Sequence, residues 1–194
     1  TFGGHGIDAM SSATALGHVK TELARGLALD EAIAAVPAAT ERALGWQAGS
    51  AGETSALLLL AGGLFLIARR IVSWHIPAAA LATVFALATV AHALDPQRFA
   101  DGMFHVLCGA TVLGAFFIAT DPVTSAVSRR GQLVFGIGFG LFVWLIRSFS
   151  AYPEGVAFAV LLMNSLTPTI DRYTRPRVFG RRASGAPLPL KGSR

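Results

Sequence analysis

The chain has 194 residues, of which 53% are hydrophobic and only 14% are charged, and its formal net charge is +5. Soluble domains carry about 25% charged residues, so this composition excludes an ordinary soluble domain and favours a membrane protein. The positive charge does not indicate nucleic-acid binding, because much of it lies in a C-terminal tail, as in a cytoplasmic flank. The single cysteine, Cys108, excludes an intrachain disulfide, a cysteine-ligated iron–sulfur cluster and a CxxC motif.

Five apolar runs predict an all-α integral membrane protein with about five transmembrane helices. We place these helices at residues 54–68, 74–94, 100–120, 133–146 and 156–170. Several runs are near or below the ~17–25 residues of a straight span, so we expect tilted helices or helices buried inside a bundle. The chain therefore divides into a segment at 1–50, a transmembrane region at 51–171 and a basic tail at 172–194.

The distribution of arginines predicts which end of each span faces the cytoplasm. Arginine pairs follow the first and third expected spans, at Arg69–Arg70 and Arg129–Arg130, and the basic tail follows the fifth. Since alternate spans bring these clusters to one side of the membrane, the positive-inside rule assigns that side, and the C-terminus, to the cytoplasm. Residues 1–50 then lie outside the cytoplasm, which agrees with their excess of acidic over basic residues.

Small residues recur inside the expected spans, where they allow helix backbones to pack closely in lipid. Gly136 and Gly140 form a GxxxG pair in the fourth span. The segment GIGFG that contains them is not a dinucleotide fingerprint, because no strand–turn–helix context surrounds it. We therefore expect this pair to mark a helix–helix contact, and we expect Cys108 to be a small buried residue.

Three charged residues near the ends of the spans each have more than one interpretation. Asp121, followed by Pro122 at the inner end of the third span, is either an ion-pathway residue or part of a helix-ending turn. Asp101, at the outer end of that span, has the same two alternatives. Arg147 can extend outward, pair with Glu154, or pair with an anionic cofactor. The histidines show no metal-ligand spacing, so we expect no metal site, and we assign no catalytic residue.

The segment Asp8-Ala9-Met10-Ser11-Ser12-Ala13-Thr14 resembles the flavinylation motif of membrane flavoproteins. That motif is an acidic residue followed by Ser or Thr, a small residue, Ala and a final Thr, and Ser12 departs mildly from a frequent Gly. In that family, a dedicated transferase esterifies the phosphate of FMN to the last Thr, here Thr14. We expect short helices at 14–25 and 30–43, so the free amides and dipole of a first helical turn would favour the phosphate at Thr14. Alternatively, a serine of the motif simply caps the helix.

Four further segments resemble the same family and follow one another in the family's order. They are Gly52-Glu53-Thr54-Ser55-Ala56, Ser73-Trp74-His75-Ile76-Pro77, Phe117-Ile118-Ala119-Thr120-Asp121-Pro122-Val123-Thr124 and Tyr152-Pro153-Glu154-Gly155-Val156-Ala157-Phe158. With the motif they cover residues 8 to about 173. The family comprises the D subunit of the bacterial Rnf complex, to which the segments are nearer, and the B subunit of the sodium-pumping NADH:quinone reductase (Nqr). Its fold has ten spans, so the resemblance implies that this chain is the C-terminal half and lacks about five.

The resemblance implies a flavin-carrying subunit of a membrane oxidoreductase in the bacterial inner membrane. Rnf exchanges electrons between ferredoxin and NAD, coupled to Na⁺ or H⁺ translocation, and its D subunit would hold covalent FMN on the outer side. The implied partners are the other membrane and iron–sulfur subunits, the FMN transferase and the lipid bilayer. A second, non-covalent riboflavin within the membrane is left open, with no residues assigned to it. The alternatives are an Nqr B subunit, or a channel or transporter subunit without a redox cofactor.

Overall fold

The computed structural model describes residues 14–47, 49, 52 and 54–175, and all regular secondary structure within these ranges is helical. The first elements are α1 (Ala15–Ala24), α2 (Leu29–Ala34), α3 (Ala39–Leu44), α4 (Ala56–Ala68) and α5 (His75–Leu94). The later elements are α6 (Gly102–Leu107), α7 (Thr111–Leu113), the π-helix η1 (Gly114–Ile118), α8 (Arg129–Phe149) and α9 (Val156–Tyr173). The expected all-α class is confirmed for the described residues.

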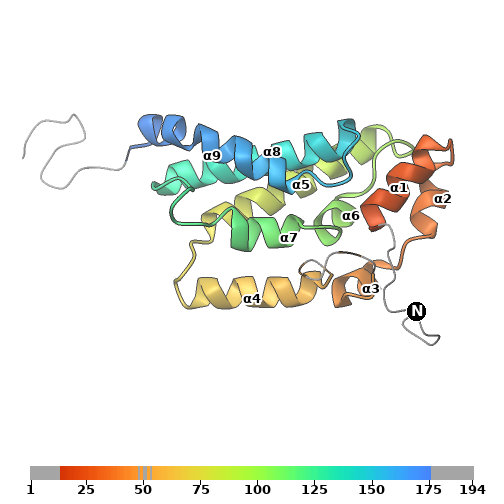
Figure 1. The fold of residues 1–194 in the computed structure, drawn as a ribbon, viewed down its shortest axis with the longest axis horizontal. Helices are drawn as coiled ribbons and strands as arrows, with labels where there is room; N and C mark the ends of the chain where they lie inside the picture. The colour runs from red at the N-terminus through yellow and green to blue at the C-terminus, as the bar shows by residue number, and fades with distance from the viewer. Residues whose placement is uncertain (1–13, 48, 50–51, 53, 176–194) are drawn as a thin grey trace, which may run out of the picture.

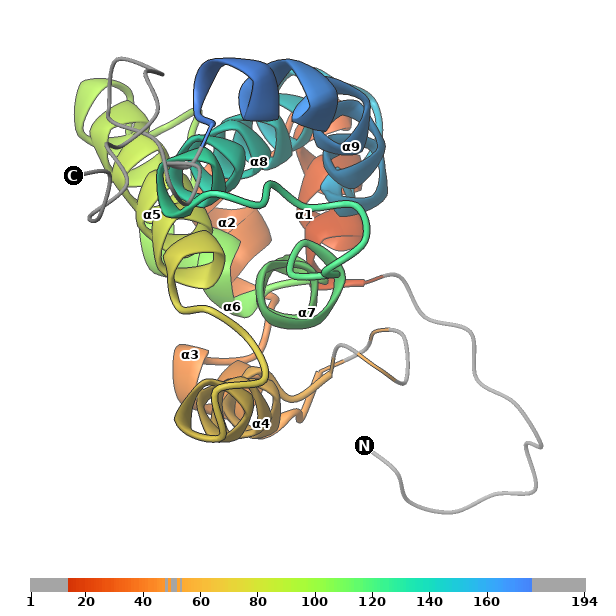
Figure 2. The ribbon, with the colours of Figure 1, turned by 90° about the vertical axis from the view of Figure 1, so that its left-hand side faces the viewer.

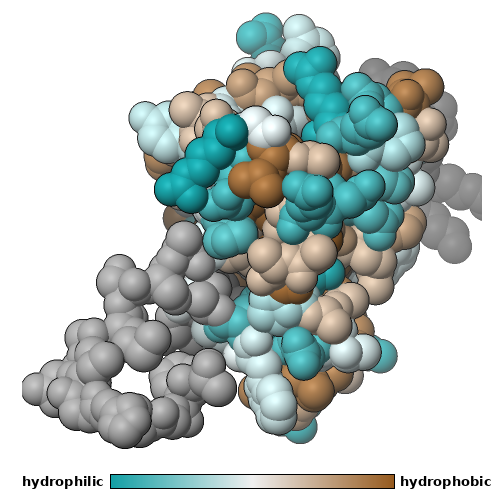
Figure 3. All heavy atoms as spheres, turned by 90° about the vertical axis from the view of Figure 1, so that its right-hand side faces the viewer, coloured by the Kyte–Doolittle hydropathy of each residue, from teal (hydrophilic) through white to brown (hydrophobic). Residues whose placement is uncertain are grey.

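The three short helices α1, α2 and α3 form a cap at one end of the molecule, on the right in Figure 1. Gly26 follows α1 with a φ of 89°, a left-handed conformation that glycine adopts without strain. Pro37 lies between α2 and α3, so the second expected helix is split in two. Seen from this end, hydrophilic side chains cover much of the surface, with hydrophobic ones between them (Figure 3).

The remaining helices run back and forth along the long axis of the molecule. In Figure 1, α4 leads away from the cap, α5 returns, α6 to η1 lead away again, α8 returns and α9 leads away. Both α5 and α8 are long and apolar enough to cross a membrane, and fewer than half of the residues in their apolar windows are buried, unlike those of a soluble core helix. Exposed apolar helices of this length support a location in a membrane.

The centre of the bundle is the contact between α5 and α8. A Cβ atom added at Gly136 would lie 2.7 Å from the carbonyl oxygen of Ile76, and one at Gly140 would lie 2.6 Å from that of Ala80. Both glycines therefore face the backbone of α5 directly, which confirms the expected role of the GxxxG pair. The neighbouring side chains Phe135, Phe139 and Val143 are completely buried.

The third expected span, at 100–120, is not a continuous helix. After α6 the chain passes through Cys108, Gly109 and Ala110 before it resumes as α7 and η1, and Gly109 has a φ of 65°. In η1 the N–H of Ala119 donates to the carbonyl of Gly114 at 2.7 Å, the wider spacing of a π-helix. The expectation of one uninterrupted helix is wrong here, because a positive φ interrupts the helical hydrogen bonds. Cys108 is completely buried, as expected.

Helix α4 lies at the edge of the bundle, beside α3, and is separated from α5, α8 and α9 in the end-on view of Figure 2. It packs through Gly63, where an added Cβ would collide with the ring of Phe116. Its other faces leave Leu58, Leu64 and Phe65 largely exposed. A 13-residue apolar helix with so much exposed hydrocarbon suits contact with lipid or with other membrane helices.

The described basic clusters lie at the end of the bundle opposite the cap. Arg69 and Arg70 follow α4, Arg129 and Arg130 begin α8, and Arg172 and Arg175 lie at the end of α9. In Figure 1 these helix ends are all on the left, away from α1. The molecule therefore has a basic end and a cap end, which we call the inner and outer ends after the orientation predicted from the sequence.

Candidate functional sites

Thr14 lies at the outer end, immediately before the ten-residue helix α1. Its Oγ1 accepts a hydrogen bond from the N–H of Gly17 at 3.1 Å, and its carbonyl accepts one from the N–H of His18 at 2.8 Å. The N–H groups of Ala15 and Leu16 have no acceptor among the described residues, and the first turn carries no acidic side chain. Thr14 is thus the N-cap rather than a first-turn residue, and its surroundings fit a phosphate ester.

Helix α1 is tied to the loop between α8 and α9 by Lys20. Its Nζ donates hydrogen bonds to the carbonyls of Ser150, at 2.7 Å, and Tyr152, at 2.5 Å. Burial and the positive charge of Arg147 lower the pKa of Lys20, and the carboxylate of Glu154 partly offsets them. The side chain of Leu16 also lies close enough to Gly109 that an added Cβ there would be 2.9 Å from its methyl carbon. The helix that follows Thr14 is therefore in contact with the break in the third crossing.

The break itself is filled by the side chain of Arg147, which comes from α8 and is completely buried. Its Nη1 donates to the carbonyl of His105, at 2.7 Å, and to Oγ1 of Thr111, at 2.6 Å. Oγ1 of Thr111 also donates to the carbonyl of His105, at 2.8 Å. Arg147 and Thr111 therefore bridge the end of α6 to the start of α7.

Glu154 neutralises Arg147 from the outer side. Its two carboxylate oxygens each lie 2.8 Å from Nη2 of Arg147, and they also accept hydrogen bonds from the N–H groups of Ala110 and Gly155. Burial favours the neutral acid, but the charge and hydrogen bonds of Arg147 and the backbone N–H groups outweigh it, so the pKa of Glu154 is lowered. A Cβ at Gly109 would collide with Oε2 of Glu154, which explains why glycine occupies this position.

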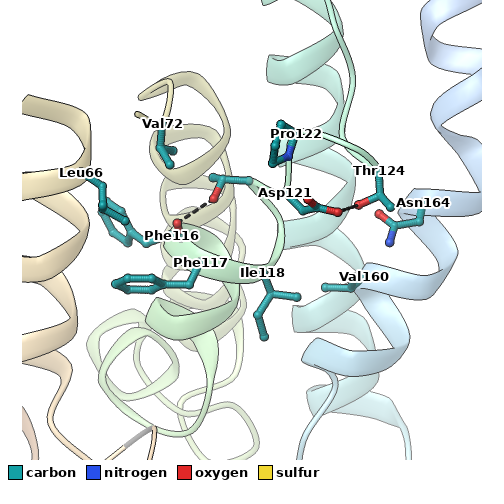
Figure 4. A pocket seen from close by; sticks show the side chains of 11 residues that line it. Leu66, Val72, Phe116, Phe117, Ile118, Asp121, Pro122, Thr124, Val160 and Asn164 are labelled. Atoms are coloured by element: carbon teal, nitrogen blue, oxygen red, sulfur yellow. Dashed lines mark hydrogen bonds between the residues drawn. The ribbon is translucent and has the colours of Figure 1, made fainter. Parts of the chain in front are cut away.

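A cavity of about 530 Å³ opens at the inner end, among α4, η1, the turn that follows it and α9. Figure 4 shows Asp121 and Asn164 on either side of Thr124, with Phe116 and Phe117 lining the part of the cavity toward α4. Oδ2 of Asp121 accepts a hydrogen bond from Thr124 at 2.9 Å, and its Oδ1 accepts one from the N–H of Val123 at 3.3 Å. Oδ1 of Asn164 is buried without a hydrogen-bond partner in the described structure.

The structure places the two ion-pathway candidates from the sequence, Asp121 and Asp101, at opposite ends of the third crossing. Asp121 lies at the inner end in a helix-ending turn, while Asp101 lies at the outer end and caps α6 by accepting from the N–H of Gly102 at 2.6 Å. Both residues thus have the structural role that the sequence offered as an alternative. The motif residues Asp8, Ser11, Ser12 and Ala13 lie outside the described residues.

Sequence reasoning foresaw the pairing of Arg147 with Glu154 as one of three alternatives, but not the partners around it. Thr111, Gly109 and Ala110 complete the site from 36 or more residues away in the chain. A signal was nevertheless present, because a Cys-Gly-Ala-Thr segment inside an apolar run offers both a flexible backbone and a hydroxyl. Oδ1 of Asn164 has no hydrogen-bond partner in the described structure, whereas the hydroxyl of Thr167, also on α9, donates to the carbonyl of Thr124.

The fold and these sites define a helical membrane protein that keeps polar groups inside an apolar bundle, through a broken helix and a cavity at its inner end. The chain belongs to the NQR2, RnfD, RnfE family, whose model matches residues 2–180. This confirms the family that the sequence segments indicated.

Relatives with similar sequences have a common description, the D subunit of an ion-translocating oxidoreductase complex. The relative from Stutzerimonas stutzeri is 54% identical over 193 residues, which cover 97% of this chain and 53% of that protein. The relatives from Halorhodospira halophila and Escherichia coli are 49% and 48% identical, over 93% and 91% of this chain and 51% and 49% of theirs. The chain thus spans about half the length of these relatives.

Proposed function

We propose that this chain is part of a flavin-carrying membrane subunit of an Rnf-type complex, which transfers electrons between ferredoxin and NAD coupled to Na⁺ or H⁺ translocation. The observation that carries the proposal is the position of Thr14, a motif threonine whose hydroxyl begins a helix with two amides free of acceptors in the described structure. Family membership and the names of the relatives support it. Covalently bound FMN would supply the one- and two-electron chemistry that the side chains lack.

The chain's own residues would attach and position this cofactor. Oγ1 of Thr14 would form the phosphoester, and the N–H groups of Ala15 and Leu16 would donate hydrogen bonds to the phosphate oxygens. Asp8, Ser11, Ser12 and Ala13 would present Thr14 to the FMN transferase. Ferredoxin, NAD and iron–sulfur clusters would be bound by the other subunits of the complex. No residue of this chain is assigned to a second, non-covalent riboflavin.

We further propose that α4, α5, the broken crossing α6–η1, α8 and α9 span the bacterial inner membrane five times. An odd number of crossings puts Thr14 outside the cytoplasm and the basic tail inside it. Asp121 would then lie where a cation arrives from the cytoplasm, in the same cavity as Asn164, whose Oδ1 has no partner within the described part of the chain. Asp101 would lie at the outer end of the same crossing. The predicted ion pathway thus has a carboxylate at each end.

Flavin attachment can be tested by expressing the full-length subunit with its FMN transferase and examining the denatured chain on a gel. We expect a band with flavin fluorescence that disappears in Thr14→Ala. The matched control is Thr21→Ala, which removes a hydroxyl of α1 that donates to the carbonyl of Gly17, and this variant should keep the fluorescence. A non-fluorescent wild-type chain, or fluorescence that persists in Thr14→Ala, would contradict the proposal.

The broken third crossing favours a second candidate, a transporter subunit without a redox cofactor, because discontinuous helices frame the binding sites of many transporters. Solute flux through the isolated subunit, together with a chain that carries no flavin, would support this candidate. An Nqr B subunit would bear the same flavin attachment, and it is distinguished by the subunits that purify with the chain.

A further inference from the structure

The carbonyl of His105 lies at the C-terminal end of the half-helix α6, inside the bundle. In a broken membrane helix, such an end carries a partial negative charge, and its carbonyls are suited to bind a cation. Here the guanidinium group of Arg147 already occupies this cation position, because its Nη1 donates a hydrogen bond to the carbonyl of His105 at 2.7 Å. The hydroxyl of Thr111, in α7, donates a hydrogen bond to the same carbonyl.

Arg147 is held there from all sides. Its side chain is completely buried, and it donates hydrogen bonds to Oγ1 of Thr111 and, on the outer side, to both carboxylate oxygens of Glu154. Because a guanidinium group keeps its charge at any physiological pH, this cation cannot be removed by deprotonation. Any cation that crosses the break must therefore displace a charge of the same sign.

We propose that Arg147 is a cation barrier at the outer end of the third crossing, which prevents passive leakage of the translocated ion. This inference rests on the proposed ion-translocating function. Arg147 would oppose the passive movement of cations through the crossing, in the way that a single arginine or a helix dipole excludes cations from other membrane pores. Glu154 then compensates this charge from the outer side, while the carbonyl of His105 and Oγ1 of Thr111 hold the guanidinium group in place.

The surroundings of the break strengthen this barrier. Lys20 lies on its outer side, and the charge of Arg147 is among the causes that lower the pKa of this lysine. At the inner end, by contrast, the described structure has a cavity with a carboxylate and an unpaired amide oxygen. The break therefore holds a buried positive charge, whereas the cavity at the inner end offers acceptors to a cation.

The test is the passive leak of Na⁺ and H⁺ from liposomes that contain the complete complex, measured with trapped indicator dyes and without an electron donor. The double variant Arg147→Gln with Glu154→Gln removes both charges with little change of shape. We expect its leak to rise about tenfold or more, which corresponds to a barrier lowered by ~1.4 kcal/mol. Arg147→Lys keeps the charge and loses the bidentate geometry, so its leak should stay near that of the wild type.

Two results would overturn the proposal. One is an assembled double variant with the leak of the wild type. The other is an Arg147→Lys variant that leaks as much as the double variant, which would make Arg147 a structural tie only. If the double variant fails to assemble, Glu154→Gln decides, because it leaves the guanidinium group uncompensated: a leak at or below wild type supports the barrier, and a larger one contradicts it. Flavin fluorescence of the same variants reports separately on the proposed function, since the leak needs no flavin.

Discussion

The two ends of the third crossing differ in how the side chains of their two candidate sites are paired. At the outer end, Arg147, Glu154, Thr111 and the carbonyl of His105 satisfy one another, and a glycine makes room for them. At the inner end, Asp121 bonds to its own turn, and Oδ1 of Asn164 has no partner among the described residues and lies beside a cavity. A closed network suits a structural tie and a barrier, while unsatisfied acceptors beside open space suit a passing ion.

The largest effect should follow from breaking the closed end. Arg147→Met removes the charge that compensates Glu154, and it removes one of the donors to Glu154 and to the carbonyl of His105. Removing one partner of a buried ion pair costs about 3–5 kcal/mol, and we expect the lower end of that range because the carboxylate side chain is 33% exposed. The loss should appear as a lowered midpoint of thermal unfolding in detergent. A midpoint unchanged from that of the wild type would show that the network contributes little to stability.

The contact between α5 and α8 should respond next. In Gly140→Ala, the new methyl group would lie 2.6 Å from the carbonyl oxygen of Ala80, a backbone atom that cannot move without separating the helices. We expect a destabilisation of about 1–3 kcal/mol, as for other overpacked cores. Gly138→Ala is the matched control, because its methyl group meets the flexible side chain of Met163 and should be tolerated better. Equal losses in both variants would contradict the described packing.

The closed end should also weaken in acid. The pKa of Glu154 is lowered from its ordinary value of 4.5, so the folded protein binds fewer protons than the unfolded chain in that range. The stabilisation is complete above about pH 4.5 and is lost as the pH falls through the lowered pKa. At pH values below about 4.5, we expect the midpoint temperature of thermal unfolding to decrease more steeply with falling pH in the wild type than in Glu154→Gln. If the midpoint depended on pH in the same way in both proteins, Glu154 would not be the source of the loss of stability in acid.

The smallest change of stability should follow from altering the inner end. Asp121→Asn keeps the size of the side chain, and only its hydrogen bonds to Val123 and Thr124 change in strength. We expect stability within about 1 kcal/mol of the wild type, normal flavin attachment and a loss of ion uptake driven by electron transfer. The control is Asp95→Asn, which alters an exposed acidic residue at the outer end. Full ion uptake in Asp121→Asn would exclude the proposed pathway.

Local patterns predicted much of the fold, whereas long-range contacts determined the rest. The expected positions of α5, the GxxxG contact and the helical class follow from hydrophobic runs and residue size, which act over a few residues. The break at Gly109 could not be located, because the side chains packed against it, Arg147 and Glu154, come from α8 and from the loop between α8 and α9. For the candidate sites, the sequence indicated Thr14 and Asp121, and only the structure showed that Thr14 caps a helix and that Asp121 lines a cavity.

The proposed function depends most on the two ends of the chain facing opposite compartments. Trp46, near the cap, and Tyr173, at the end of α9, are 75% and 83% exposed, and the native Cys108 is buried. Each of the two aromatic residues can be replaced by cysteine in the full-length subunit and labelled with a membrane-impermeant maleimide. We predict that Trp46→Cys reacts only from outside intact cells and that Tyr173→Cys reacts only in inverted membrane vesicles. Reaction of both from the same side would contradict an odd number of crossings, and reaction of both from the opposite sides would reverse the orientation.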